Sequence, residues 1–417
     1  MPRGAASDPR PSPAAAYAQW MDACAAAGWR AMPAAEQVPV RDGLGRVTAA
    51  PVRARWPSPR ADCAAMDGIA IKAAPAAVGV WQLAAPAFAW VDTGDLMPAG
   101  MDTVVERERV QFGADGSAQI TGPAPRGLNV RATGEDFPAG ELLIGAGHRL
   151  RPADLAAAAA AGHATLEVAR RPVAAIIPTG DEIRPAGSAL GPGEVTDSNS
   201  LLLAARAKET GARPLVSDVQ PDDPDAIAAE IRRAALMAGL VLVIAGSSAG
   251  RSDHTAAVLA RAGGLAVRGV AVRPGHPVLL GYALPGPAPA GRGAAAVPVI
   301  GIPGYPLAAA VIFELFAAPL LAALQGRQPA DRVWQRAQLA CDWVSSPDVE
   351  DWVPVSLAPA PAGEDASYPV VATPGRRGAG SVSRLMHAHA WWPIPIGKGK
   401  FARGELIDVQ PMPGASL

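Results

Sequence analysis

The chain has 417 residues, half of them apolar, with 37 basic and 38 acidic residues and a formal net charge of −1. This composition excludes a disordered chain, and the balanced charge, without a basic or aromatic-interleaved tract, argues against a nucleic-acid partner. Three widely spaced cysteines and no apolar run near the ~20 residues of a membrane span predict a cytoplasmic protein without a membrane partner.

The N-terminal part of the sequence predicts a tail and a linking domain. Residues 1–13 are rich in Pro, Ser and Ala and are expected to be disordered. A helical pattern at 14–32 follows, with Tyr17, Trp20, Met21 and Cys24 on one face. Residues 14–50, together with residues 146–171, are assigned to this helical linking domain.

Residues 51–145 differ in character from this linking domain. They show short alternating segments with many Gly and Pro breakers, which predicts a β-rich domain. An Ala-rich helix is expected at 152–162, where Pro152 suits the first turn and Asp154 is placed too late to cap the helix.

Strands and helices alternate through residues 172–326, which predicts an α/β domain. The runs VAAIIP, ARPLVSDV, LVLVIA and VPVIGI are typical of strands buried in a sheet. Helices are expected after them at 198–210, 222–238, 252–262 and 307–324, so the sheet should be parallel and doubly wound. Residues 327–417 are strand-like again and predict a small C-terminal β-barrel, with a β-sandwich as the alternative.

Three loops between these elements carry groups that suit a phosphorylated ligand. Ligands of open α/β sheets bind at the carboxyl ends of the strands. The turn Thr179–Glu182 combines a glycine with two carboxylates that can hold Mg²⁺, although a turn with solvated acids is equally compatible. The loop Gly246–Asp253 can cradle an oxyanion and supply a metal ligand, or simply cap the next helix. Arg273–Pro277 carries two cationic groups, or is an ordinary Pro/Gly turn.

Read together, the motifs resemble the molybdopterin molybdenumtransferase family, the molybdenum insertases related to the gephyrin E domain. The resemblance runs from about residue 14 to 411, and its elements occur in family order. They are Gly43–Val47, Ala64–Ile71 (SAMDGYAV-like), Thr93–Val105, Gly134–Asp136, Thr179–Glu182 (TGDE), Thr196–Ser200, Pro221–Pro224 (PDDP), Gly246–Asp253 (GGVSVGxxD-like), Pro274–Pro277 (PGKP-like), Pro303–Pro306 (LPGNP-like) and Gly380-Ser381.

The resemblance implies a molybdenum or tungsten insertase of molybdenum cofactor biosynthesis. In this family, Mg²⁺-dependent cleavage of adenylated molybdopterin releases AMP while the metal of molybdate, or of tungstate, enters the dithiolene. It also implies a homodimer, with a shared site to which the β-rich module contributes, and a client molybdo- or tungstoenzyme.

The resemblance also assigns roles to residues of this chain. It implies catalytic roles for Asp67, Asp136, Glu182, Asp222 and Asp253, of which Glu182 and Asp253 would bind the metal. Cofactor-binding roles fall on Thr93, Gly180, Asp181, Ser198, Gly246, Ser247, Ser248, Gly250, Arg273, His276, Pro303, Tyr305 and Ser381.

The chain departs from the family pattern in its cationic loop and in two glycine loops. His276 replaces the usual lysine of PGKP, which removes a permanent charge, while Arg251 adds one. IPGYP replaces LPGNP, so the chain resembles a divergent branch. These changes keep two alternatives open: a non-catalytic molybdopterin carrier or sensor, and a molybdopterin adenylyltransferase.

Overall fold

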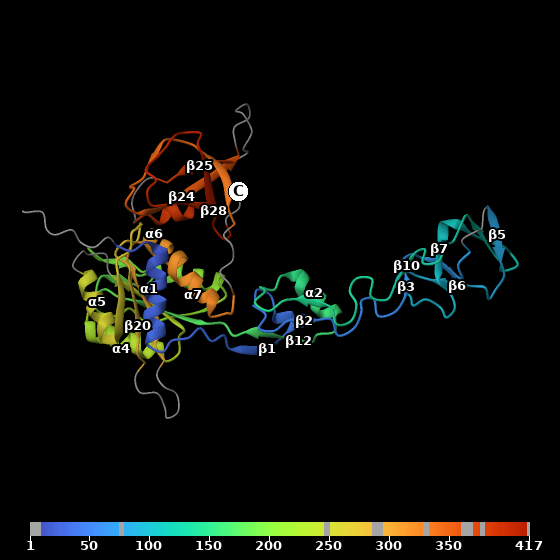
Figure 1. The fold of residues 1–417 in the computed structure, drawn as a ribbon, viewed down its shortest axis with the longest axis horizontal. Coiled ribbons are helices and arrows are strands. Elements are labelled where there is room, and N and C mark those ends of the chain that lie inside the picture. The colour runs from blue at the N-terminus through green and yellow to red at the C-terminus, as the bar shows by residue number, and fades with distance from the viewer. Residues whose placement is uncertain are drawn as a thin grey trace, which may run out of the picture. The chain divides into compact units, whose positions relative to one another are not determined.

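The computed structural model describes residues 10–74, 79–245, 251–285, 295–327, 333–359, 370–375 and 380–414, with only the backbone described at 245 and 251–253. The chain divides into two compact units (Figure 1). The inserted unit comprises Ala35–Ala169, and the main unit comprises Met1–Ala34 with Arg170–Leu417.

The main unit is built around a six-stranded sheet in the order β16-β13-β17-β21-β20-β18. The first four strands are parallel, as predicted, whereas β20 and β18 extend one edge as antiparallel strands. The strands are β13 (Val173–Pro178), β16 (Arg213–Val216), β17 (Leu240–Ala245), β18 (Gly263–Arg268), β20 (Leu279–Ala283) and β21 (Val297–Pro303).

Helices cover both faces of this sheet, so it is doubly wound, as the sequence predicts. One core cluster joins the sheet to α1 (Pro13–Ala26), α3 (Asn199–Glu209), α6 (Pro306–Ile312) and α7 (Ala318–Ala323). The other joins it to α4 (Pro224–Ala235) and α5 (Arg251–Ala262). The continuous stretch Pro306–Ala323 is apolar enough to cross a membrane, but 67% of it is buried in the protein, as in a core helix.

Helix α1 is shorter than predicted and begins on a packed segment. It ends at Ala26 rather than near residue 32, because Gly28 adopts a φ of +91° that a helix cannot continue. At its start, Ser12 Oγ accepts the Ala15 N–H at 3.3 Å, and the Pro11 carbonyl accepts the Ala271 N–H at 2.9 Å. The last residues of the predicted disordered tail are therefore held against the sheet domain.

The C-terminal part of the main unit is a closed five-stranded β-barrel, as predicted. Pairing of β24 with β26 closes the ring β24-β25-β22-β28-β26. The short strand β19 (Val272–Arg273) runs parallel to the start of β24 and links the barrel to the sheet domain. The barrel strands are β22 (Gln335–Leu339), β24 (Glu350–Pro359), β25 (Val370–Pro374), β26 (Ala390–Ile394) and β28 (Leu406–Pro411).

In its described part, the inserted unit consists of small sheets, the α-helix α2 (Pro152–Ala160) and two short 3-10 helices. Strand β1 (Ala35–Pro39) pairs with β12 (Thr165–Ala169), near α2. The β-rich remainder holds two three-stranded sheets, β6-β4-β7 and β5-β9-β8, and two strand pairs. The pairs are β3 (Cys63–Ala64) with β10 (Val130–Arg131), and β2 (Val52–Arg53) with β11 (Leu142–Ile144). The strands of the three-stranded sheets are β4 (Gly68–Ile71), β5 (Val80–Leu83), β6 (Phe88–Val91), β7 (Thr103–Glu106), β8 (Val110–Phe112) and β9 (Ala118–Thr121).

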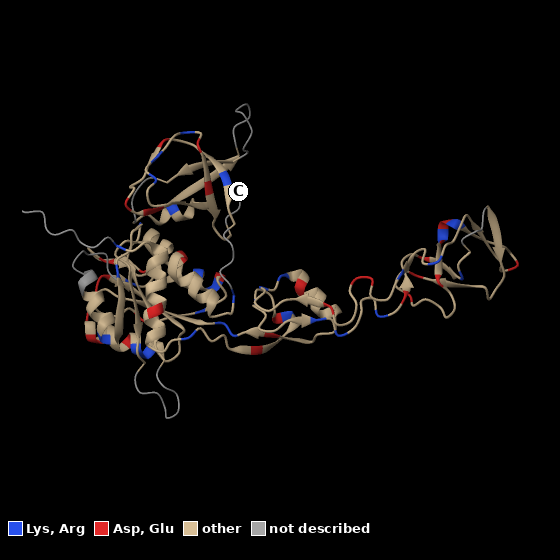
Figure 2. Ribbon diagram, viewed as in Figure 1, with Lys and Arg blue, Asp and Glu red and all other residues tan. Residues whose placement is uncertain are grey.

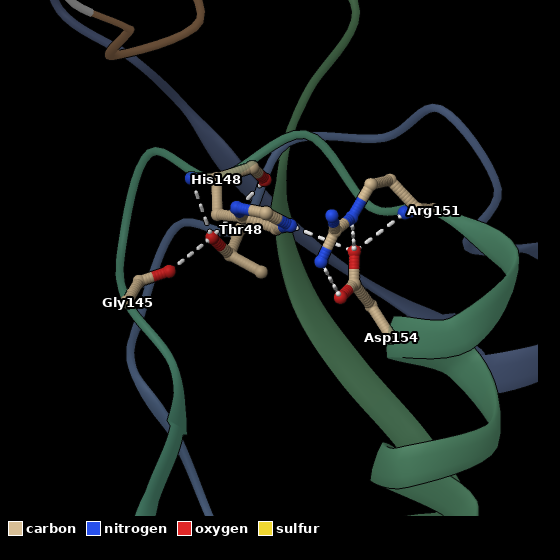
Figure 3. Close-up of polar contacts among 5 residues, drawn as sticks. All are labelled: Thr48, Gly145, His148, Arg151 and Asp154. Atoms are coloured by element: carbon tan, nitrogen blue, oxygen red, sulfur yellow. Dashed lines mark hydrogen bonds and ion pairs between the residues drawn. The ribbon is translucent and has the colours of Figure 1, made fainter.

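Asp154 does cap α2, contrary to the sequence prediction (Figure 3). Its Oδ2 accepts the backbone N–H of Arg151 at 2.7 Å, because the third helical residue of a capping box reaches back to the residue before the helix. The Arg151 guanidinium and His148 Nε2 also bind this carboxylate, at 3.0 and 2.7 Å. The hydrogen bonds from Arg151 and His148 lower the pKa of Asp154 strongly.

Acidic and basic residues are interspersed along the described part of each unit (Figure 2). Typical pairs are Arg233 with Glu230 on α4 and Arg131 with Glu135 in the inserted unit, at 2.5 and 2.9 Å. This mixed pattern agrees with the net charge of −1.

Candidate active site

The candidate site begins at the turn after β13, at the carboxyl end of the sheet. Thr179 is buried there and ties the turn to β17, because its N–H and its hydroxyl both donate to the Ile244 carbonyl, at 3.2 and 2.9 Å. Gly180 follows with a φ of +135°. A Cβ on Gly180 would lie 2.7 Å from Glu182 Oε2. A glycine is therefore needed for the Glu182 carboxylate to lie over this turn.

A second acidic segment lies beside this turn. The N–H of Asp222 donates to Asp181 Oδ1 at 3.3 Å, so the TGDE and PDDP motifs are in direct contact. The neighbouring Asp223 has a structural role, because its carboxylate accepts the N–H of Asp225 at the start of α4 at 2.8 Å. Of the two adjacent aspartates, Asp222 is thus the one turned to the site.

A small cleft opens at this end of the sheet, with a volume of about 310 Å³ when its solvent-open part is included. Its polar lining is Thr179, Asp222, His254 and Thr255, and its apolar lining includes Val243. The sequence analysis did not select His254 and Thr255. The signal that would have found them is their place in the first turn of α5, directly after the Gly/Ser loop.

The start of α3 contacts the loop after β21. Asn199 is 7% exposed, and its Nδ2 donates to the Gly304 carbonyl at 2.7 Å. Its Oδ1 and the hydroxyl of Ser200 are buried and have no hydrogen-bond partner within the described residues. Buried polar atoms are rarely left unpaired, so a bound group is expected here. Sequence reasoning selected the adjacent Ser198, which precedes the first turn of α3, and missed Asn199.

Two further predicted residues come together on the β21 side of the site. Tyr305 precedes α6 and is 47% exposed. A Cβ on Gly380 would lie 3.4 Å from the Tyr305 ring, so the backbone before Ser381 packs near that ring. The Ser381 hydroxyl lies 2.8 Å from that of Ser383. Pro303, the last residue of β21, precedes this loop.

The PGHP loop lies at the same end of the sheet. Strand β20 is antiparallel to β21, with Leu279 opposite Gly301, which places the loop before β20 alongside the end of β21. Gly275 packs tightly against α6, since a Cβ there would lie 2.8 Å from Ile312 Cδ1. The loop is therefore fixed in position by α6, the helix that begins after Tyr305.

Arg273 is already paired with a carboxylate of the barrel. Its Nε and Nη2 donate to Asp351 at 3.2 and 2.5 Å, and the Ser345 hydroxyl donates to the same carboxylate at 2.8 Å. The hydrogen bond with Asp351 raises the pKa of Arg273. Arg273 was predicted as an oxyanion ligand, but in this structure its two charge-assisted bonds hold the barrel to the sheet domain.

His276, three residues after Arg273, is exposed to solvent. Partial burial of its imidazole and the nearby charge of Arg10 lower its pKa below the usual value of 6.5. At neutral pH the imidazole is therefore predominantly uncharged, and it contributes less positive charge to the loop than a lysine would.

In the inserted unit, the structure holds Asp67 and Asp136 in separate turns. Asp67 Oδ1 accepts the N–H and the hydroxyl of Thr93, at 2.7 and 2.8 Å, and these bonds lower the pKa of Asp67. Asp136 Oδ2 accepts the hydroxyl of Ser58 at 3.5 Å. Two hydrogen bonds from the predicted Thr93 thus keep the Asp67 carboxylate ionised.

Part of the predicted site lies outside the described residues. Gly246, Ser247, Ser248 and Gly250 belong to that part, and of Asp253 only the backbone, in α5, is described. Over the residues whose side chains are described, no group of three His, Cys, Asp or Glu is arranged as a metal site.

Family comparisons cover nearly the whole chain. Residues 13–162 match the MoeA N-terminal region, domains I and II, and residues 336–412 match the MoeA C-terminal region, domain IV. Between them, residues 175–323 match a probable molybdopterin binding domain.

Named relatives give the same result. A molybdopterin molybdenumtransferase of a Nostoc species is 29% identical, with 88% of this chain and 87% of that protein covered. A molybdopterin molybdenumtransferase 2 of Mycobacterium tuberculosis is 32% identical over 61% of both chains. A molybdopterin biosynthesis MoeA protein from Pyrococcus horikosii has a similar structure, with a TM-score of 0.76, 27% identity, and 96% of this chain and 98% of that one covered. From its fold, its ordered motifs and these matches, the chain belongs to the MoeA family of molybdopterin molybdenumtransferases.

Proposed function

We propose that this protein is a cytoplasmic molybdenum insertase of molybdenum cofactor biosynthesis. It cleaves adenylated molybdopterin, releases AMP and transfers the metal of molybdate to the dithiolene. The observation that carries the proposal is the contact of two acidic turns beside a cleft, through the hydrogen bond from Asp222 to Asp181. The full-length likeness to named molybdopterin molybdenumtransferases supports it.

The residues at the sheet edge fit magnesium. Mg²⁺ prefers oxygen ligands and is usually held by one or two carboxylates together with substrate phosphates and water. Asp222 lines the cleft, the Asp181 carboxylate accepts its N–H, and Glu182 lies over the same turn, so oxygen donors predominate. In the proposal, Glu182 and Asp253 hold the ion, which when bound neutralises charge on the phosphoanhydride oxygens.

The chain's own groups bind and orient the substrate. Thr255 offers a hydroxyl donor to a phosphate oxygen in the cleft, and Asp222 orients the attacking water there. The unpaired Oδ1 of Asn199 accepts a hydrogen bond from an N–H group of the pterin. No cysteine ligand is needed, because the dithiolene sulfur atoms belong to the substrate.

The proposal includes a homodimer and roles for Asp67 and Asp136 of the inserted unit. Asp67 is suited to bind a hydrogen-bond donor or a cation, because its bonds with Thr93 keep it ionised. Light scattering of the full chain tests the dimer. Asp67→Asn and Asp136→Asn variants test the two roles by the rate of AMP release.

The central experiment follows AMP release from adenylated molybdopterin with Mg²⁺, comparing molybdate with tungstate. The expected result is oxyanion-dependent AMP release that Glu182→Ala abolishes. Glu194→Ala is a matched control, because Glu194 is an ion-paired carboxylate of the loop that follows the same turn. AMP release by the wild type no faster than by Glu182→Ala would refute the proposal.

A non-catalytic carrier or sensor is the second candidate function. It is favoured by the pairing of Arg273 with Asp351 and by the lowered pKa of His276, which both reduce the free positive charge of the PGHP loop. Calorimetric binding of molybdopterin without AMP release would select this alternative. An assay with ATP and molybdopterin tests the adenylyltransferase alternative.

A further inference from the structure

The PGHP loop has a second positively charged neighbour, supplied by the segment ahead of α1. Arg10 lies near His276 and Gly269: a Cβ on Gly269 would lie 3.1 Å from the His276 carbonyl oxygen and 3.4 Å from Arg10 Cδ. Arg10 and His276 are both exposed to solvent. The Arg10 side chain thus lies against Gly269, near the backbone of His276, and its charge acts on the His276 imidazole.

The backbone holds Arg10 in this place. The carbonyl of Pro11, the next residue, accepts the Ala271 N–H at 2.9 Å, and the side chain of Ser12 caps α1. The carbonyl of His276 in turn accepts the Val270 N–H at 3.0 Å. Pro11, which follows Arg10, and His276 are thus both hydrogen-bonded to the neighbouring residues Val270 and Ala271.

Among the residues that the structure describes, no carboxylate is paired with Arg10. Arg273, which directly precedes the PGHP loop, forms an ion pair with the buried Asp351. Within the described residues, Arg10 forms no ion pair, and it lowers the pKa of His276. An anion bound beside Arg10 would supply a counter-charge to its guanidinium and would also favour the protonated imidazole of His276.

We propose that Arg10 is the permanent positive charge of the PGHP loop and that Arg10 and His276 together bind a tetrahedral oxyanion of the substrate pair. The inference rests on the proposed function in one respect, the identity of the anion: molybdate, or a phosphate group of the pterin nucleotide. A lysine at position 276 would carry a permanent positive charge, which His276 lacks at neutral pH. In the proposal, Arg10 supplies this charge from outside the loop. Sequence reasoning could not assign this role, because Arg10 lies in the predicted disordered tail.

The test measures anion binding directly on the full-length protein. The C–H signal of His276, assigned with a His276→Gln variant, is followed by NMR with molybdate in one arm and inorganic phosphate in the other. In the wild type, the bound anion is expected to raise the pKa of His276. In Arg10→Ala, anion affinity is expected to fall about tenfold or more, the size typical of a lost charge-assisted hydrogen bond.

Two variants separate charge from structure. Arg10→Lys keeps the charge and is expected to keep most of the affinity, whereas Arg213→Ala removes a matched exposed arginine of the same unit and is expected to change nothing. Without anion, Arg10→Ala is expected to raise the pKa of His276 toward 6.5. Thermal unfolding checks that each variant is folded.

The outcomes distinguish this inference from the proposed function. Equal anion affinity of wild type and Arg10→Ala, or no effect of either anion on His276, overturns the role of Arg10. AMP release is judged separately, by comparison with Glu182→Ala. Failure of AMP release with intact anion binding at Arg10 would refute the insertase while supporting the anion site. Tighter binding of one anion identifies which oxyanion the site takes.

Discussion

Removal of the Arg273 side chain should destabilise the contact between the barrel and the sheet domain. The Asp351 carboxylate is only 7% exposed, and in Arg273→Ala its remaining side-chain donor, among the described residues, is the Ser345 hydroxyl. Breaking a fully buried pair costs about 3–5 kcal/mol, whereas an exposed pair is worth about 0–1 kcal/mol. Because the Arg273 side chain is 37% exposed, we expect an intermediate loss of about 2 kcal/mol.

This loss is measured by urea unfolding of the full-length wild type and of the three variants that make up a double-mutant cycle. Arg273→Ala and Asp351→Ala should each be destabilising, and the double variant should be less destabilised than their sum, because neither charge is left unpaired. Arg273→Lys keeps the charge without the bidentate geometry and should lose less than Arg273→Ala. A change below about 0.5 kcal/mol for Arg273→Ala, combined with weaker molybdate binding, would show that Arg273 binds the oxyanion instead.

Three further outcomes are expected. Asp154→Asn should destabilise the inserted unit by about 1–2 kcal/mol in thermal unfolding. The lowered pKa of Asp154 means that this contribution is fully present above pH ~4 and is lost as the pH falls toward the folded-state value, so a loss that began near pH 7 would contradict the assignment. Gly180→Ala should cost about 1–3 kcal/mol and reduce AMP release, because of the positive φ and the contact with Glu182; unchanged urea unfolding would disprove the strain. Asn199→Ala should weaken molybdopterin binding about tenfold in calorimetry, and an unchanged affinity would remove Asn199 from the pterin site.

The local sequence pattern was sufficient to find the parallel strands of the sheet domain. The runs that became β13 and β17 were predicted to the residue, because a strand buried on both faces must be apolar throughout. The antiparallel β20 and β18 were not predicted, since strand direction depends on the partner rather than on the strand's own residues. The capping role of Asp154 was misjudged, because the helix begins at Pro152, which makes Asp154 its third residue.

The sequence by itself determined which loops end the buried strands and which acids they carry, because glycine, proline and apolar runs set the backbone locally. Only the tertiary structure decided what those side chains contact. It places Asp181 against Asp222, pairs Arg273 with Asp351 of the barrel and positions Arg10 against Gly269, near the backbone of His276. These pairs join residues tens to hundreds of positions apart, and charge alone does not say which of many carboxylates an arginine will meet. The packing of separate elements makes that choice, because it brings some of these groups within hydrogen-bond distance and keeps others apart.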